Sequence, residues 1–306
     1  MKLYAPSYYP DFTCAADRCR HSCCVGWEID VDEATACRYA ALTEGYGACV
    51  RDSVETDAAT QTPHFRLGTD ERCPHLDERG LCRIILLLGE EYLCDICREH
   101  PRFYHTTPHG MEVGLGMACE EACRLILTSD GYDRMIAVGE EEGEAEPAEL
   151  DATAHRTRIY EMMSDRAVPY TERLTIIADA YGVSLSDRTD AEWRERLASL
   201  EYLDEAHRAL FGCYSSGAEQ AKAFETALAR ALAYFVFRHV SSAADADELC
   251  AAVGFSLLCE RLLASLIEAR EVRSFEAIVE LARTVSEELE YSEDNTETLK
   301  QAFWTL

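Results

Sequence analysis

Twelve of the fifteen cysteines in this chain precede residue 124, and that density constrains the first half of the fold more than any other feature. The tightest group is Cys14, Cys19, Cys23 and Cys24. Because the total is odd, the cysteines cannot all pair with one another inside one chain. Ordinary core packing does not require such a group, so we expect a metal or iron–sulfur site.

A second set of cysteines lies further along the first half. It comprises Cys73, Cys82, Cys94, Cys97, Cys119 and Cys123. A turn at Gly80 is expected to bring Cys82 back toward Cys73. Thiolate sulfur is a soft ligand that suits zinc and iron–sulfur clusters. Only Cys94 and Cys97 have the two-residue spacing typical of structural zinc sites, so spacing alone leaves the metal open.

The remaining cysteines are isolated, and most fall in helical patterns. They are Cys37, Cys49, Cys213, Cys250 and Cys259. Free cysteine is among the most frequently buried residue types and packs as a small hydrophobic side chain. We therefore predict packing roles for these five.

The chain carries 57 acidic and 29 basic residues, a formal net charge of −28. This charge disfavours binding to phosphate backbones, so we expect no nucleic-acid partner. An acidic surface suits a basic protein or a lysine side chain, but for any given stretch we favour the alternative, a solvated surface that keeps the protein soluble. The first residues do not resemble a secretion signal, and we see no apolar run near the roughly 20 residues of a membrane span. We expect no membrane partner and a cytoplasmic location, where clustered cysteines indicate metal binding rather than disulfides.

The sequence changes character near residue 140. Residues 139–150 include two glycines, a proline and a run of glutamates, which predicts an acidic linker or loop. We therefore predict a Cys-rich, metal-organised domain over 1–138 with irregular loops, followed by an all-α domain over 151–306. The fold class is mainly α.

Spacings of three and four between apolar residues predict amphipathic helices in the second half. Leu174, Ile177, Ala178 and Tyr181 form one such series, and Trp193, Leu197, Leu200 and Leu203 form another. Further helices are expected at about 218–239, 246–268, 274–290 and 295–304, with Ser274 as an N-cap. In the first half we expect helices at about 32–43, 83–99 and 118–129, and at most a short hairpin around 102–116. We see no strand–helix alternation of the kind a parallel sheet needs.

The cysteine motifs and several segments around them resemble the flagellin lysine-N-methylase family of bacteria over most of the chain. The stretches that carry the resemblance run from Tyr4 to Cys14, Cys19 to Ile29, Cys73 to Ile84 and Leu88 to Phe103, with Phe237-Arg238-His239 and Glu288 to Asn295 near the end. The first half is also similar to small zinc- or iron-chelating proteins.

The resemblance implies a protein-lysine N-methyltransferase that uses S-adenosylmethionine and a 4Fe-4S cluster, with flagellin or a similar protein as substrate. The cysteines that match the family, and are therefore the implied metal ligands, are Cys14, Cys19, Cys23, Cys24, Cys73, Cys82, Cys97 and Cys119. Cys94 and Cys123 stand where relatives are expected to have other residues, so we interpret them as extra thiols.

The usual glycine-rich turn for S-adenosylmethionine is missing. Val113-Gly114-Leu115-Gly116 comes nearest, and a hairpin or close-packing role fits it better. Arg98 and Arg102, four apart on an expected helix, are candidates to bind the cofactor carboxylate or to form structural ion pairs.

A lysine amine must lose a proton before it can attack, which needs a base or a desolvated aromatic slot. The candidate aromatic residues are Tyr8, Tyr9, Trp27, Tyr92 and Tyr104, with core packing as the alternative role. The candidate bases or ligands are His75, His100, His105 and His109.

Two other functions fit the same sequence. One is a zinc-stabilised interaction module without catalysis, in which the cysteines only supply folding energy. The other is an iron–sulfur redox protein.

Overall fold

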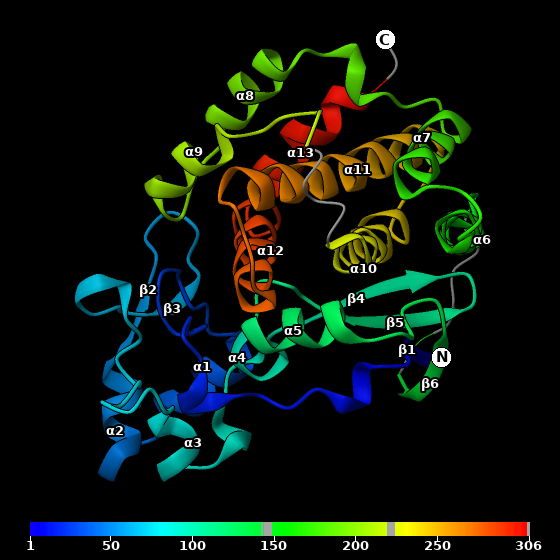
Figure 1. The fold of residues 1–306 in the computed structure, drawn as a ribbon. Helices are drawn as coiled ribbons and strands as arrows, with labels where there is room; N and C mark the ends of the chain where they lie inside the picture. The colour runs from blue at the N-terminus through cyan, green and yellow to red at the C-terminus, as the bar shows by residue number, and fades with distance from the viewer. Residues whose placement is uncertain (142, 144–148, 219–223, 305–306) are drawn as a thin grey trace. The chain divides into compact units, whose positions relative to one another are not determined.

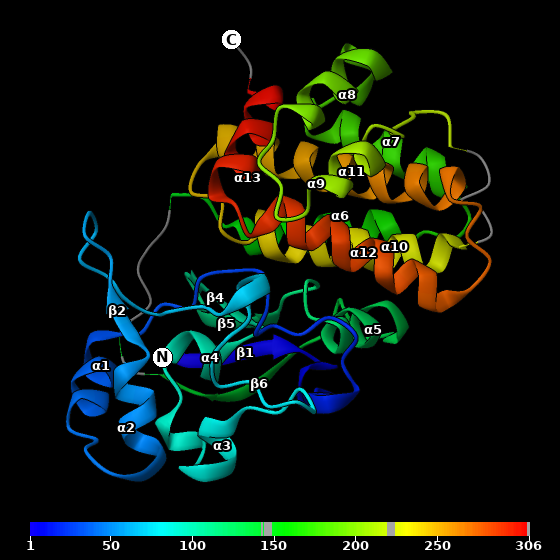
Figure 2. The same cartoon turned by 90° about the vertical axis from the view of Figure 1, so that its left-hand side faces the viewer.

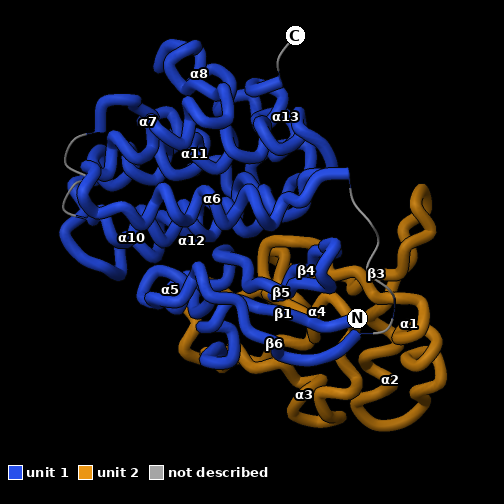
Figure 3. The backbone as a smooth tube through the Cα atoms, turned by 90° about the vertical axis from the view of Figure 1, so that its right-hand side faces the viewer, with its two compact units in different colours: residues 1–12, 102–306 blue, residues 13–101 orange. Residues whose placement is uncertain are grey.

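The computed structural model describes residues 1–141, 143, 149–218 and 224–304 (Figures 1 and 2). The chain forms two compact units, which Figure 3 distinguishes by colour. Unit 1 combines residues 1–12 with residues 102–306, and unit 2 comprises residues 13–101. Helices predominate, which confirms the mainly α prediction.

Unit 1 contains a four-stranded sheet in the order β4-β5-β1-β6. Its strands are β4 (Arg102–Thr107), β5 (Gly110–Leu115), β1 (Lys2–Pro6) and β6 (Met135–Glu140). The antiparallel pair β4 and β5 is the predicted hairpin. β1 pairs parallel to β5 and antiparallel to β6, neither of which was predicted, because the paired residues are more than a hundred positions apart in sequence.

Gly114, on β5, has a packing role. A Cβ atom at this position would lie 2.3 Å from Phe103 Cζ and 2.6 Å from Phe237 Cε1, closer than real Cβ atoms approach. The glycine therefore allows the π-helix residue Phe237 to approach the sheet. This agrees with the close-packing interpretation of Val113 to Gly116.

The remainder of unit 1 is helical, as predicted. Its helices are α5 (Glu120–Thr128), α6 (Ala152–Ser164), α7 (Tyr170–Ala180), α8 (Asp190–Ala198), α9 (Glu205–Phe211), α10 (Glu225–Phe235), α11 (Ala246–Ala269), α12 (Phe275–Glu290) and α13 (Glu293–Lys300). A π-helical turn, η7 (Val236–Val240), extends α10, and the unit also contains the short turns η1 (Tyr9–Asp11), η5 (Leu185–Asp187) and η8 (Gln301–Phe303). The Ser274 hydroxyl accepts from Ala277 N, so the predicted cap of α12 is confirmed.

The apolar series of the helices mostly face the core of unit 1. Trp193 and Leu197 are fully buried and Leu200 is 4% exposed, whereas Leu203, beyond the end of α8, is 51% exposed. α11 runs through this core, and 89% of its most apolar 18-residue window is buried. By length and composition this helix could cross a membrane, contrary to the expectation that no stretch would pass that test. Its packing against α7, α10, α12 and α13 accounts for its apolar composition.

Unit 2 is built from short elements. They are η2 (Ala16–Arg18), α1 (Glu33–Ala40), α2 (Gly45–Asp52), β2 (Val54–Thr56), β3 (Pro63–Phe65), η3 (Thr69–Glu71), α3 (Arg83–Leu87), η4 (Glu90–Tyr92) and α4 (Asp95–Glu99). A small core joins them, formed by Ile29, Val31, Tyr39, Val50, Phe65, Cys73, Ile84, Leu93 and Cys94.

The single helix predicted over 83–99 is wrong. The chain leaves α3 at Leu88 and turns at Gly89, whose φ of +110° is one that side-chain-bearing residues rarely adopt. A Cβ there would also lie 2.3 Å from the Glu91 carboxylate. The apolar spacing typical of a helix continues through this turn, although the backbone is not helical there.

The compact units divide at residues 12/13 and 101/102, and the predicted boundary near 138 stays a prediction. β6 extends to Glu140, so the start of the predicted acidic linker is a strand. Residues 142 and 144–148 of that linker lie outside the described residues.

Candidate metal centre and buried polar network

Five cysteines of unit 2 gather around its small core. Cys73 and Cys94 are buried members of that core, and Cys24, Cys82 and Cys97 are half-buried against it. Four of the five are among the predicted ligands, and the fifth, Cys94, was interpreted as an extra thiol. The structure therefore brings half of the predicted ligand set together and adds one cysteine to it.

Backbone contacts between segments distant in sequence hold these thiols in place. Cys73 N donates to Cys24 O at 2.8 Å, which joins the N-terminal cysteine loop to the second set. Leu76 and Cys82 form an isolated antiparallel bridge across the turn at Gly80, which has a φ of +79°. The turn thus brings Cys82 back toward Cys73, as predicted.

Asp77 fixes the same turn. Its Oδ1 atom accepts from Arg79 N at 2.8 Å and from Leu81 N at 2.9 Å. Cys82 then stands at the N-terminal end of α3, and Cys94 stands at the N-terminal end of α4. Local turn chemistry and helix starts therefore position the thiols, which is why short segments suffice.

The thiols influence one another electrostatically. Burial raises the pKa of Cys73 to about 12, and neighbouring Cys24, Cys82 and Cys94 add to the effect. A hydrogen bond with Cys94 raises the pKa of Cys97, whereas the same bond lowers that of Cys94. Several thiolates in this space would repel one another without a cation between them. A soft, multiply charged metal centre would remove that repulsion.

The surroundings of Cys24 lower the pKa of its thiol. A hydrogen bond from Cys23 lowers its pKa to about 7 against the opposing effect of burial, and Ser22 and Arg72 contribute further. A thiol of this kind is partly thiolate near neutral pH, which is the form that binds metals.

The other four predicted ligands are not members of the unit 2 core, although Cys23 hydrogen-bonds to Cys24. Cys14 and Cys23 are exposed and Cys19 is half-buried, and the Cys14 sulfur accepts from Ala16 N at 3.4 Å. Cys119 belongs to unit 1, where it stands at the N-terminal end of α5. Their metal ligation stays a prediction.

Not all the cysteines interpreted as packing residues are buried. Cys259 is fully buried in the unit 1 core, but Cys37, Cys49 and Cys213 are exposed. The packing prediction is therefore wrong for those three. A residue type's average burial does not determine which face of a helix the residue occupies.

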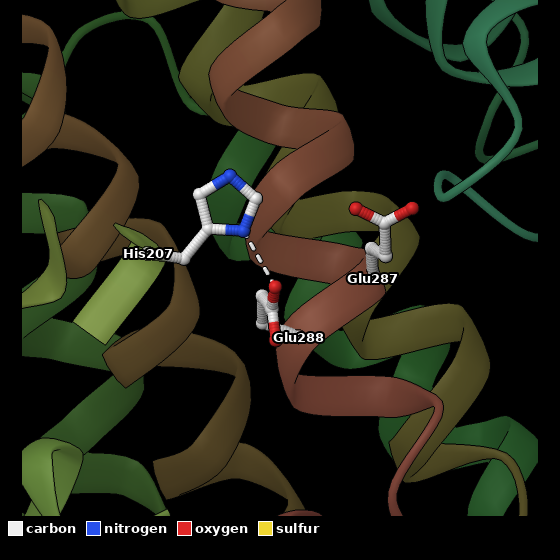
Figure 4. Close-up of side chains that lie close together, drawn as sticks. All are labelled: His207, Glu287 and Glu288. Carbon is white, nitrogen blue, oxygen red and sulfur yellow. Dashed lines mark hydrogen bonds and ion pairs between the residues drawn. The ribbon is translucent and has the colours of Figure 1, made fainter. Parts of the chain in front are cut away.

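A group of oxygen and nitrogen ligands lies in unit 1, where His207, Glu287 and Glu288 have ligand atoms within 4.8 Å of one another (Figure 4). Glu288 Oε1 accepts from His207 Nδ1 at 2.5 Å and from Asp204 N at 3.2 Å, and its Oε2 accepts from Leu203 N at 2.8 Å. Glu287 is 2.7 Å from Arg283. These carboxylates already have protein partners, so we interpret the group as a connection between α9 and α12.

Arg98 and Arg102 do not share a helix, so that expectation is wrong. α4 ends at Glu99, and Arg102 opens strand β4 in the other unit. Arg98 pairs with Asp95 and with Glu99, as in the structural alternative. Arg102 Nε donates to Tyr9 OH at 2.8 Å. Their role in cofactor binding stays a prediction.

The candidate bases have varied surroundings. His75 is buried between Tyr46 OH and Ser53 Oγ, each 2.8 Å from a ring nitrogen, and burial lowers its pKa to about 4. His109 is largely exposed beside Asp151. His105 is half-buried on β4, and its Nε2 atom is buried without a hydrogen-bond partner among the described residues.

The candidate aromatic residues mostly pack. Tyr8 belongs to the unit 1 core, Tyr9 packs against that core, and Tyr92 packs against the core of unit 2. Trp27 Nε1 donates to Cys23 O at 2.8 Å, which ties it to the cysteine loop. Tyr104 is 43% exposed.

A buried polar network in unit 1 was not predicted. At its centre is Glu290, whose Oε1 accepts from His239 Nε2 at 2.6 Å and lies 3.3 Å from Arg238 Nε. Its Oε2 accepts from Tyr234 OH at 2.8 Å and also from Ser286 Oγ. Burial opposes ionisation, but Arg238 and the hydrogen bonds from His239 and Ser286 outweigh it and lower the pKa of Glu290.

The sequence did contain a signal for this network. Arg238 and His239 lie in the Phe237-Arg238-His239 motif, and Glu290 lies in the Glu288 to Asn295 motif, but neither motif had been given a role. η7 presents Arg238 and His239 to the end of α12, and π-helical turns occur often at functional sites.

Unit 2 thus contains a thiol-rich centre, and unit 1 contains a charged, buried network. Comparison with known proteins gives distant relatives. The chain is 30% identical over 129 residues to the lysine-N-methylases of Salmonella typhimurium and Salmonella choleraesuis, which covers 40% of this chain and 31% of theirs. It is 28% identical over 162 residues to the flagellar biosynthetic protein FliU of Salmonella muenchen, which covers 51% of this chain and 92% of that protein.

The chain therefore spans about a third of the lysine-N-methylases that it matches. No family model matches the sequence, and no solved structure matches it either. The chain is distantly similar to flagellar lysine-methylase-like proteins, and the resemblance seen in its motifs is supported to that extent.

Proposed function

We propose that this protein is a protein-lysine N-methyltransferase that uses S-adenosylmethionine as methyl donor. The observation that carries the proposal is its similarity to two proteins named lysine-N-methylase. In a polar transfer the lysine nitrogen attacks the methyl carbon, the carbon–sulfur bond breaks with its electron pair on sulfur, and the nitrogen loses a proton. S-adenosylhomocysteine is the second product.

The proposal includes a 4Fe-4S cluster held by unit 2. Four of the five gathered thiols would bind it, namely four of Cys24, Cys73, Cys82, Cys94 and Cys97. When bound, the cluster would supply iron chemistry that amino-acid side chains lack. The residues fit this group because the donors are all sulfur and because the buried thiolates need a compensating cation.

The charge of the chain supports a basic protein as substrate. With a net charge of −28, the protein attracts lysine-rich surfaces and accelerates their association. Flagellin is the candidate that the similarity to flagellar proteins suggests.

The free thiols of this chain suit a reducing, cytoplasmic compartment, which is the location that we propose.

Purification without oxygen tests the cofactor and the activity together. We expect a brown protein with about four iron ions per chain, which transfers labelled methyl groups from S-adenosylmethionine to lysines of candidate proteins, located by mass spectrometry. A colourless protein with one zinc per site and no transfer would support the interaction module. Reversible reduction without any response to S-adenosylmethionine would support a redox protein.

Single substitutions test the proposed ligands. Cys97→Ser should lower the iron content and the visible absorption, because Cys97 lies half-buried against the core with the other thiols. Cys213→Ser is the matched control, since Cys213 is exposed and belongs to unit 1. Equal iron contents in the two variants would contradict the proposed site.

A further inference from the structure

We infer that Arg238 binds a carboxylate group, and that His105 assists it. The inference rests on the proposed function, in which S-adenosylmethionine brings a carboxylate on its amino-acid portion and a protein substrate brings acidic side chains. Both sources have the same chemistry, which a guanidinium recognises through paired hydrogen bonds.

Arg238 is held from three sides within unit 1. Its Nε lies 3.3 Å from Glu290 Oε1, and its Nη1 donates to Tyr234 OH at 3.2 Å. Its Cζ lies 4.7 Å from the centre of the Phe103 ring. These contacts fix the plane of the guanidinium, so little side-chain entropy would be lost when it binds a ligand.

The side chain that carries this fixed guanidinium is not fully enclosed. The Arg238 side chain is 21% exposed, whereas the Glu290 side chain behind it is 1% exposed. The contacts that hold Arg238 use Nε and Nη1, which leaves Nη2 for a ligand. Glu290 balances the charge of Arg238, so the attraction to a carboxylate would come mainly from directed hydrogen bonds.

Glu290 itself is positioned firmly. Tyr234, Ser286 and His239 all donate to it, and Tyr234 OH also accepts from Met117 N at 3.2 Å. Met117 lies two residues after the end of β5, so the network connects the sheet to η7 and α12. A group supported in this way keeps its geometry when a ligand arrives.

His105 provides a second polar atom beside Arg238. Its ring centre is 5.2 Å from that of Phe103, the ring that Arg238 also contacts. Its Nε2 atom is buried and lacks a partner among the described residues. A buried polar atom without a partner is unfavourable, and a bound carboxylate would satisfy it if Nε2 carries the proton.

Other arginines are less suitable. Arg156 is 5% exposed and uses both terminal nitrogens on Glu112 and Ser241. Arg102 donates to Tyr9, and Arg98 pairs with two acidic neighbours. Arg102 is thus held through Nε, and the Arg98 side chain is 45% exposed, so neither arginine expected from the sequence is fixed as firmly as Arg238.

Two nucleosides that differ in the amino-acid portion test the inference. S-adenosylhomocysteine contains the carboxylate and 5′-methylthioadenosine lacks it. We expect Arg238→Gln to weaken binding of S-adenosylhomocysteine about 10- to 100-fold, as befits lost hydrogen bonds to a charged group, and to leave 5′-methylthioadenosine unchanged. Arg238→Lys should give an intermediate loss, and His105→Gln a smaller one.

Matched variants separate binding from folding. Arg230→Gln removes another partly buried arginine, on α10, that bonds to Leu127 O and Asp130. It should not change the ratio of the two affinities. Iron content and thermal unfolding of each variant report whether the fold is intact. Equal weakening of both nucleosides by Arg238→Gln would show a structural role and overturn the inference.

The remaining outcomes are distinct. If neither affinity changes but KM for the protein substrate rises, the carboxylate comes from the substrate and Arg238 still binds it. If neither affinity nor KM changes, or if only Arg98→Gln or Arg102→Gln alters the ratio, the inference is wrong while the proposed function stands. A wild-type protein that binds no nucleoside and transfers no methyl group refutes the proposed function, and this inference with it.

Discussion

Two glutamates near the end of α12 have different tasks. Glu288 accepts from Leu203 N and His207, and so secures the start of α9. Glu290 gathers donors from α10, η7 and its own helix. Two positions along a helix correspond to a rotation of about 200°, so the two side chains lie on nearly opposite sides of α12. The same short motif can therefore serve both sides of α12.

The His207–Glu288 pair predicts a specific dependence of stability on pH. The hydrogen bond with Glu288 raises the pKa of His207 above its usual 6.5. A raised native pKa contributes stability that is fully present below the unfolded pKa and is lost as pH rises through the native one. The free energy of unfolding of wild type should therefore exceed that of His207→Gln most at pH 6 or below, and the difference should shrink in alkaline solution.

His109→Gln is the control for this measurement, because the His109 side chain is 63% exposed. Urea unfolding at several pH values gives all three curves. A wild-type advantage over His207→Gln that stayed constant from acid to alkaline pH would contradict the ion pair.

Gly114 gives a second prediction for a single residue. In Gly114→Ala the new methyl group would collide with Phe103 and Phe237, which lie 2.3 Å and 2.6 Å from its position. Overpacking of this kind usually costs about 1–3 kcal/mol. Gly139→Ala on β6 is the control, since its nearest neighbour, Leu3 Cδ2, lies at 3.8 Å. Chemical denaturation should separate the variants, and equal stabilities would show that the two rings move aside freely.

α12 is the element that connects most of the features of unit 1. Ser274 caps its start, and its other end carries both Glu288 and Glu290. It packs against α5, α11 and α13. A change at its first turn therefore affects the helix that positions the polar network.

Removal of the Ser274 cap should destabilise unit 1. Ser274 Oγ accepts from Ala277 N at 3.3 Å, and loss of such a cap costs about 1 kcal/mol. Ser164→Ala is the matched control, because Ser164 Oγ bonds to Glu161 O at the exposed end of α6 and caps no helix start. Thermal unfolding should rank Ser274→Ala below Ser164→Ala, and the reverse order would contradict the assigned cap.

The helices were more predictable than the strands because a helix is determined by neighbours three and four positions away. The periodic series at Trp193 and Leu197 therefore marked α8 correctly. β1 depends on partners in β5 and β6, and no local pattern in Lys2–Pro6 indicates them. The break at Gly89 was missed because apolar spacing does not report a backbone dihedral angle.

At the scale of the whole chain, the two units differ in how much apolar core they contain. Unit 1 has an extended core that includes α10, α11 and α12. Unit 2 has nine buried core residues, of which two are cysteines. A small core rarely stabilises a domain without help from metals or cross-links. Metal binding by unit 2 would therefore contribute to its folding energy.

Iron removal should accordingly loosen unit 2 more than unit 1. We expect amide hydrogen exchange to accelerate across residues 13–101 after chelation under anaerobic conditions, while α11 stays protected. Reconstitution with iron and sulfide should restore the original rates. Faster exchange spread equally over both units would argue against a metal centre confined to unit 2.

The gathering of cysteines was predictable, but which of them gather was not, and their metal binding stays a prediction. Clustered cysteines indicated metal chemistry, and Cys24 and Cys73 do meet. Which thiols gather depends on turns and helix starts, so the place of Cys94 among them was not predicted. Arg98 and Arg102 were paired on the assumption of one helix, whereas Arg238 is positioned by Glu290, 52 positions further along the chain.

The discontinuity of unit 1 has a consequence for biosynthesis. Lys2–Pro6 is translated before residues 13–101, whereas its neighbours in the sheet, Gly110–Leu115 and Met135–Glu140, are translated only after all of them. The cysteine-rich segment 13–101 is thus complete before the strands that pair with β1 have been made. Iron delivered during translation would therefore meet a complete segment 13–101 before the helices of unit 1 have been made.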